Sequence, residues 1–106
     1  RYLFRAVDKR HGLTKKVLCD VGCAYGANLF FCSSGSYGIE LKTDRAEFAR
    51  SLGFTVYQRD LMKDEVTDLP EAEAVWCSAV LEHVASPHIL LRKIHQLISR
   101  TSSLGL

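Results

Sequence analysis

Four short apolar runs, each about the length of a β-strand, constrain the fold of this chain most strongly. They cover residues 17–21, 37–41, 54–57 and 74–78, and segments with helix signals lie between them. Strands that are apolar along their whole length are typical of a parallel sheet covered on both faces. Strands that alternate with helices predict βαβ units with right-handed crossovers. We therefore expect an α/β fold in which a parallel sheet lies between two layers of helices.

Helix signals occupy the segments around these strands. Residues 2–11 and 26–32 are each expected to form a helix. Asp44 and Glu47 match a capping box, which predicts the start of another helix. The inward face of that helix is expected to hold four apolar residues, Ala46, Phe48, Ala49 and Leu52. The Ser-Pro pair at residues 86–87 is a favoured N-cap and first position for a last helix.

The composition is that of one soluble domain. The chain has 106 residues, 47% of them hydrophobic and 25% charged, and its net charge is +2. This charge argues against a nucleic-acid surface, which needs a clustered basic face. No apolar run approaches the roughly 20 residues that span a bilayer. The four cysteines form no C-x-x-C pair, so we expect no metal site, and reduced thiols favour a cytoplasmic location.

A turn of small residues follows the first strand. Gly22, Ala24 and Gly26 stand at alternate positions, and the turn leads into a predicted helix. Glycine permits a tight turn and the close approach of a ligand, and a helix N-terminus favours negative or polar ligand groups. Asp20 interrupts the apolar strand just before the turn, and a buried carboxylate needs hydrogen-bonding or cationic partners. A plain strand-to-helix turn, braced by Asp20, is the alternative.

Acidic residues end the second and third strands. Glu40 follows the start of the glycine turn by about 20 residues, a spacing typical of an acid that binds ribose hydroxyls. A solvated glutamate beside Lys42 is the alternative. Asp60 is placed to accept a hydrogen bond from the exocyclic amine of an adenine, and the alternative is a surface ion pair with Arg59 or Lys63.

The segment after the fourth strand carries two further polar residues, Glu82 and His83, between apolar neighbours. His83 is a candidate general base, because histidine exchanges protons near neutral pH. The alternative is a structural histidine that packs beside the site.

Together these motifs resemble the class I S-adenosylmethionine-dependent methyltransferase family, of the type that acts on small molecules. Residues 19–26 match its motif of an apolar strand, an acid and G-x-G-x-G, with Ala24 in place of the middle glycine. Glu40 matches the acid that binds the cofactor ribose. Residues 60–61 match the acid–apolar pair beside the adenine, and residues 78–84 match the signature after the fourth strand, which is the most specific of these matches.

The resemblance covers residues 16–98 and implies a Rossmann-like three-layer sandwich with strand order 3-2-1-4. Family members continue with a fifth parallel strand, and residues 102–106 stop where that strand would begin. We therefore expect a fold that is incomplete on its C-terminal side. Its fourth strand would be an edge that pairs either with a further segment of the protein or with another copy of the chain.

The resemblance also implies a cofactor, a reaction and a set of site residues. It implies that residues 1–106 form one domain that binds S-adenosylmethionine and transfers its methyl group to an unidentified, small-molecule acceptor. His83 is the candidate catalytic base. The implied cofactor-binding residues are Asp20, Gly22, Cys23, Ala24, Gly26, Glu40, Leu41, Asp60, Leu61, Ala79 and Leu81.

Two other functions stay open from the sequence. A methyltransferase-like module without activity would serve as a binding domain, and the short chain and Ala24 favour this interpretation. A nicotinamide-dependent oxidoreductase would explain the glycines and Glu40. That second class does not account for Asp20, Asp60 or the segment around His83.

Overall fold

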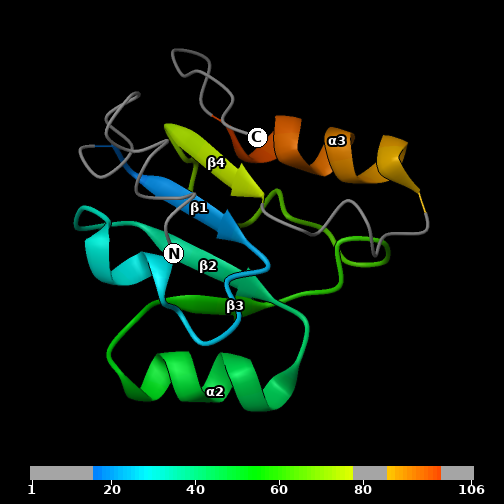
Figure 1. Ribbon diagram of the computed structural model, residues 1–106. Coiled ribbons are helices and arrows are strands. Elements are labelled where there is room, and N and C mark those ends of the chain that lie inside the picture. The colour runs from blue at the N-terminus through cyan, green and yellow to red at the C-terminus, as the bar shows by residue number, and fades with distance from the viewer. Residues whose placement is uncertain (1–15, 78–85, 99–106) are drawn as a thin grey trace.

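A four-stranded parallel sheet forms the centre of the computed structural model, which describes residues 16–77 and 86–98. The strands are β1 (Leu18–Val21), β2 (Tyr37–Glu40), β3 (Val56–Gln58) and β4 (Ala74–Cys77). Their order across the sheet is β3-β2-β1-β4, and every pairing is parallel (Figure 1). This confirms the α/β class and the strand order 3-2-1-4 that the sequence indicated.

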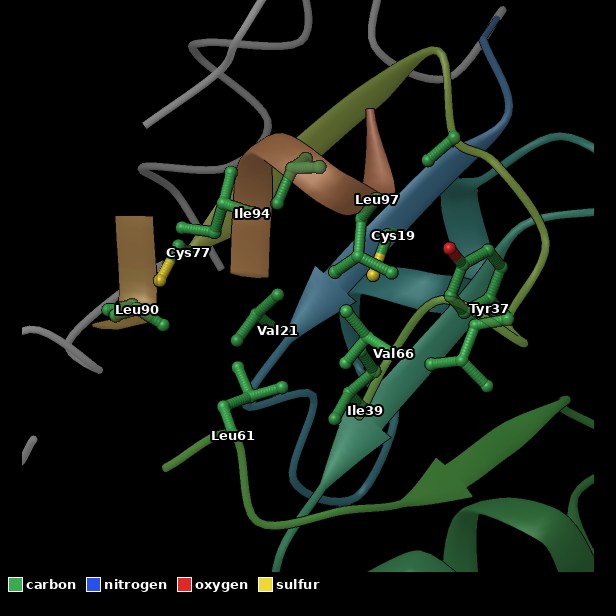
Figure 2. Packing of buried hydrophobic residues seen from close by; sticks show 13 residues of the cluster. Cys19, Val21, Tyr37, Ile39, Leu61, Val66, Cys77, Leu90, Ile94 and Leu97 are labelled. Atoms are coloured by element: carbon green, nitrogen blue, oxygen red, sulfur yellow. The ribbon is translucent and has the colours of Figure 1, made fainter. Parts of the chain in front are cut away.

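The strands are largely apolar because helices cover both faces of the sheet. All residues of β1, β2 and β4 are buried. On one face, α3 (Pro87–Leu97) packs against side chains from β1 and β2, and Figure 2 shows the core between them. On the other face, α2 (Thr43–Ser51) packs against β2 and β3. Along β1 and β2, the residues that pack under α3 alternate with three residues on the opposite face of the sheet, Asp20, Gly38 and Glu40.

The segment after β1 forms less helix than the sequence predicts. Instead of a helix over residues 26–32, the structure contains one 3-10 turn, η2 (Asn28–Phe31). Its backbone bonds span three residues, from Leu29 N to Gly26 O and from Cys32 N to Leu29 O. Cys32 is already extended. The chain must reach the start of β2 within a few residues, which leaves room for a single tight turn.

The capping box predicted for α2 is wrong. The helix begins at Thr43, its N-cap is Lys42, and Asp44 lies inside the first turn. The N-cap makes no side-chain capping bond. Two strand residues stabilise this start instead: Glu40 Oε2 accepts from Lys42 N at 2.8 Å, and Gln58 Nε2 donates to Thr43 Oγ1 at 2.6 Å.

The inward face of α2 is also narrower than predicted. Ala46 and Ala49 are fully buried, but Phe48 is 50% exposed and Leu52 is 45% exposed. The two alanines bring the helix close to the sheet, and larger side chains are left at its margin. Phe48 instead makes an edge-to-face contact with Tyr25, with 5.5 Å between ring centroids.

The start of α3 agrees with the sequence. Ser86 is the N-cap, its Oγ accepts from Ile89 N at 3.4 Å, and Pro87 opens the helix. The helix predicted for residues 2–11 lies outside the described residues. Within residues 16–77 and 86–98, no helix has the length and apolar character needed to cross a bilayer. In the same residues, His, Cys, Asp and Glu side chains form no group of three that would hold a metal ion.

Candidate functional site

The turn after β1 is bonded to the carboxyl end of β2. Gly22 N and Cys23 N both donate to Ile39 O, at 2.8 and 3.2 Å. Ala24 N donates to Glu40 Oε1 at 2.9 Å. Three successive backbone N–H groups are therefore directed at the last two residues of β2. The glycine turn and the acid that the sequence singled out thus lie together at the carboxyl edge of the sheet (Figure 1), where parallel α/β sheets bind ligands.

The conformation of this turn explains its small residues. Gly22, Ala24 and Gly26 all have positive φ angles, of 76°, 52° and 87°. Within the described residues, Ala24 is the only residue other than glycine with a positive φ. An L-residue in this region costs roughly 1–2 kcal/mol relative to its favoured conformations. The alternation of small residues therefore follows from the backbone, and Ala24 occupies its position under strain.

Glu40 is a buried acid that joins two loops. Glu40 is only 6% exposed, so the alternative prediction of a solvated glutamate is wrong. One carboxylate oxygen accepts from Ala24 N and the other from Lys42 N. Each carboxylate oxygen has capacity for a second hydrogen bond, so Glu40 can hold both loops and also accept from a ligand diol.

Cys23 fills the space above a glycine of β2. A Cβ atom on Gly38 would lie 2.4 Å from Cys23 Sγ, so only glycine fits there. Burial, assisted by the negative charges of Asp20 and Glu40, raises the pKa of the Cys23 thiol to about 12. The thiol is thus neutral at physiological pH. Its role in the turn is to pack, not to act as a nucleophile.

Asp20 lies deep in the sheet, between Gly38 of β2 and Trp76 of β4 in the strand register. The residue is 2% exposed. The structure thus confirms that this acid is buried within the strand that leads into the glycine turn. Its charge contributes, after burial, to raising the pKa of Cys77 to about 11. Asp20 therefore places negative charge beneath the edge where the turn and Glu40 meet.

Asp60 follows β3 in a turn of its own. Asp60 Oδ1 accepts from Met62 N at 2.9 Å, and Asp60 N donates to Asp64 Oδ2 at 2.7 Å. Arg59, the cation suggested as its surface partner, instead binds both oxygens of Asp68 at 2.9 Å. This pairing also lowers the pKa of Asp68. Asp60 is thus positioned by its bonds to Met62 and Asp64, and not by an ion pair with Arg59.

The two leucines beside these acids differ in exposure. Leu61 is 8% exposed and belongs to the core under α3, as Figure 2 shows, whereas Leu41 is 53% exposed. An exposed leucine directly after Glu40 offers an apolar surface to a flat ring. Ala79, Leu81 and His83 lie outside the described residues.

Sequence reasoning missed two residues that shape the site. Gly38 lies inside an apolar strand, and its only signal is a glycine where a strand would favour a side chain. Lys93 lies on the apolar stripe of α3, three residues after Leu90 and next to Ile94, yet it is 7% exposed. A lysine at a buried helical position would have indicated a specific partner.

These features fit a nucleotide cofactor that carries positive charge. Gly22 is exposed and leaves the backbone of the turn open to close approach at that point. Asp20 lies within β1, Glu40 ends β2 and Asp60 follows β3, and these three strands are adjacent. A carboxylate whose oxygens retain acceptor capacity suits a ribose diol, and negative charge beneath the turn suits a cation.

Comparison with known proteins supports this interpretation. The methyltransferase domain family model matches residues 19–104. Among solved structures, a coclaurine N-methyltransferase bound to N-methylheliamine and SAH is 18% identical with a TM-score of 0.80, covering 97% of this chain and 34% of that one. An S-adenosylmethionine-dependent methyltransferase from Mesorhizobium loti is 26% identical with a TM-score of 0.67, covering 79% and 42%.

A sugar N-methyltransferase from Streptoalloteichus sp. is 21% identical with a TM-score of 0.72, covering 97% of this chain and 44% of that one. No curated protein matches the chain. By these coverages, the chain spans less than half the length of each of the three solved structures. Because the family model matches most of its residues, the chain belongs to the methyltransferase domain family, whose cofactor is S-adenosylmethionine.

Proposed function

We propose that this protein transfers a methyl group from S-adenosylmethionine to a small-molecule acceptor, and that residues 1–106 form one cofactor-binding domain. The observation that carries the proposal is the contact between the glycine turn and Glu40. The Ala24 N–H and the Lys42 N–H bind the two oxygens of one buried carboxylate. A nucleotide site at the edge of the sheet is thereby pre-organised before a ligand binds.

Each part of the cofactor has a complementary group in this arrangement. Glu40 accepts from the ribose hydroxyls with the acceptor capacity that its backbone partners leave. Leu41 and Leu61 border the adenine, and Asp60 accepts from the exocyclic amine of the adenine. The turn from Gly22 to Gly26, with Cys23 packed beneath it and Asp20 at its base, holds the methionine part.

The remaining roles belong to the segment after β4. Ala79 and Leu81 wall the site near the reacting groups, and His83 removes a proton from the acceptor. S-adenosylmethionine supplies a methyl group that is already activated by a positive sulfur. The contribution of the protein is therefore to hold and orient donor and acceptor and to exclude water, and such positioning lowers the barrier by several kcal/mol.

Two observations support a small-molecule acceptor. The net charge of +2 is mild, and the solved relatives include one bound to N-methylheliamine and one described as a sugar N-methyltransferase. A cytoplasmic location is supported by the four cysteines of the chain, none of which forms a disulfide. Among the described strands, β4 is an outer one, and we propose that a further segment or a second copy pairs with it.

The test is a calorimetric titration of the full-length protein with S-adenosylhomocysteine and, separately, with NAD. We expect micromolar binding of S-adenosylhomocysteine and none of NAD. Transfer of a labelled methyl group into a pool of amines, sugars and phenols would then identify the acceptor class, and His83→Ala should slow that transfer near neutral pH. Binding of NAD alone would contradict the proposal. Cofactor binding with no transfer to any acceptor would favour an inactive binding module.

A further inference from the structure

Lys93 is a buried cation on the apolar stripe of α3. Its neighbours on that stripe, Leu90, Ile94 and Leu97, are at most 1% exposed, and Lys93 itself is 7% exposed. Its Nζ donates to the backbone oxygen of Asp64 at 2.6 Å, and it lies 3.5 Å from a carboxylate oxygen of Glu65. A buried ammonium is costly unless it is hydrogen-bonded. The partner of Lys93 is thus the turn that follows β3.

Asp64, whose backbone oxygen accepts from Lys93, is hydrogen-bonded directly to Asp60. Asp64 N donates to Asp60 O at 2.7 Å, and Asp64 Oδ2 accepts from Asp60 N at 2.7 Å. Both backbone polar groups of Asp60 therefore bond to Asp64, while the Asp64 oxygen is held by α3. The Lys93 ammonium group thus links Asp60, through Asp64, to α3.

A second cation holds the same turn from the other side. Arg59 Nη1 donates to the backbone oxygen of Glu65 at 2.8 Å, and both guanidinium amino groups bind Asp68. The consecutive oxygens of Asp64 and Glu65 therefore bind one cation from α3 and one from the end of β3. Asp60 Oδ1 accepts from Met62 N, and the carboxylate keeps further acceptor capacity for a ligand.

We propose that Lys93 is a positioning residue for base recognition: by holding the Asp64 oxygen, it fixes Asp60 where its carboxylate selects a purine with an exocyclic amine over one with an oxo group. This inference rests on the proposed function, because it takes Asp60 to face the adenine of the cofactor. Lys93 acts through Asp64 and does not itself contact the ligand. An oxo group in place of the amine would direct an acceptor at the carboxylate, which repels it.

The test compares S-adenosylhomocysteine with S-inosylhomocysteine, which carries an oxo group in place of the amine. Both are titrated calorimetrically into the full-length protein, and the ratio of the two Kd values is the readout. A change that only loosens the fold weakens both ligands alike and leaves this ratio unchanged. The variants are Lys93→Met, Lys93→Arg, Asp60→Ala and, as a matched control, Arg92→Met, which removes an exposed cation from the same helix.

We expect the native protein to prefer the adenine ligand by tenfold or more. Lys93→Met should reduce that ratio at least threefold, Lys93→Arg should retain most of it, and Arg92→Met should leave it unchanged. Asp60→Ala should abolish the preference. A Lys93→Met protein that folds, binds S-adenosylhomocysteine and keeps the native ratio would overturn the inference.

Two other outcomes separate the inference from the proposed function. If Asp60→Ala keeps the native ratio while S-adenosylhomocysteine still binds, the cofactor assignment stands and the role of Lys93 in base recognition is refuted. If neither ligand binds the native protein, the proposed function and the inference that rests on it both fail. If Lys93→Met does not fold, Lys93→Gln is measured in its place: its neutral amide is one bond shorter than the lysine side chain, so the bond to the Asp64 oxygen is weakened and the ratio must fall.

Discussion

Two turns at the carboxyl edge of the sheet are held in different ways. The turn after β1 is fixed by its own backbone: strained φ angles, N–H groups directed at β2, and a cysteine packed onto Gly38. The turn after β3 is fixed by charged side chains: Arg59 and Lys93 donate hydrogen bonds to the backbone oxygens of residues 65 and 64. The first arrangement restricts which residues can occupy the turn. The second depends on partners that are distant in the sequence.

This difference decides what the sequence could predict. Positive φ angles and close packing require small residues. The first turn could therefore be predicted from the small residues Gly22, Ala24 and Gly26. Glu40 was predictable because its spacing from that turn is fixed by one βαβ unit. The strand order was predictable from the resemblance to the methyltransferase family, and it agrees with the rule that parallel strands are joined by right-handed crossovers.

The rest of the site and fold could not be predicted, for physical reasons. Lys93 is 29 residues from Asp64, and nothing local indicates that they meet. Phe48 lies at the margin of α2 because two alanines set the approach of that helix to the sheet, and apolar spacing alone does not distinguish a centre from a margin. The segment after β1 forms only the short η2 turn because β2 begins a few residues later, at Tyr37.

The largest expected effect tests the packing of the first turn. Gly38→Ala places a Cβ atom 2.4 Å from Cys23 Sγ and 2.7 Å from Cys23 Cβ, so the turn must shift. We expect the free energy of unfolding to fall by about 3 kcal/mol, measured by urea denaturation. Gly53→Ala is the control: it has a positive φ of 96° but nothing within 4 Å, and should lose only about 1 kcal/mol. Equal losses would show that Cys23 does not constrain β2.

A smaller effect tests the strain at Ala24. Ala24→Gly relieves an L-residue with a φ of 52°, and the greater freedom of glycine in the unfolded chain offsets part of the gain. We expect the protein to be stabilised by about 0.5–1 kcal/mol, measured as a rise in Tm. Ala27→Gly, at a φ of −56°, should not be stabilising. A loss of stability in Ala24→Gly would mean that the alanine methyl makes favourable contacts that exceed the strain.

The smallest effect tests the charged turn. Arg59 lowers the pKa of Asp68, so the pair stabilises the fold above the unfolded-state pKa of this carboxyl, and the contribution is lost as the pH falls through the lower folded-state pKa. Because the pair is exposed, we expect Asp68→Asn to lower Tm slightly at pH 7. The difference from the native protein should shrink below about pH 4. A difference in Tm that does not change with pH would exclude the ion pair as its cause.

The central claim is that the first turn and Glu40 form one cofactor site, and calorimetry of two glutamate variants tests it most directly. Glu40→Ala removes the buried carboxylate that binds Ala24 N and Lys42 N, whereas Glu47→Ala removes an exposed glutamate of α2. We predict that Glu40→Ala weakens S-adenosylhomocysteine binding at least tenfold, about 1.4 kcal/mol, and that Glu47→Ala leaves it unchanged. Native affinity in a folded Glu40→Ala protein would contradict the account.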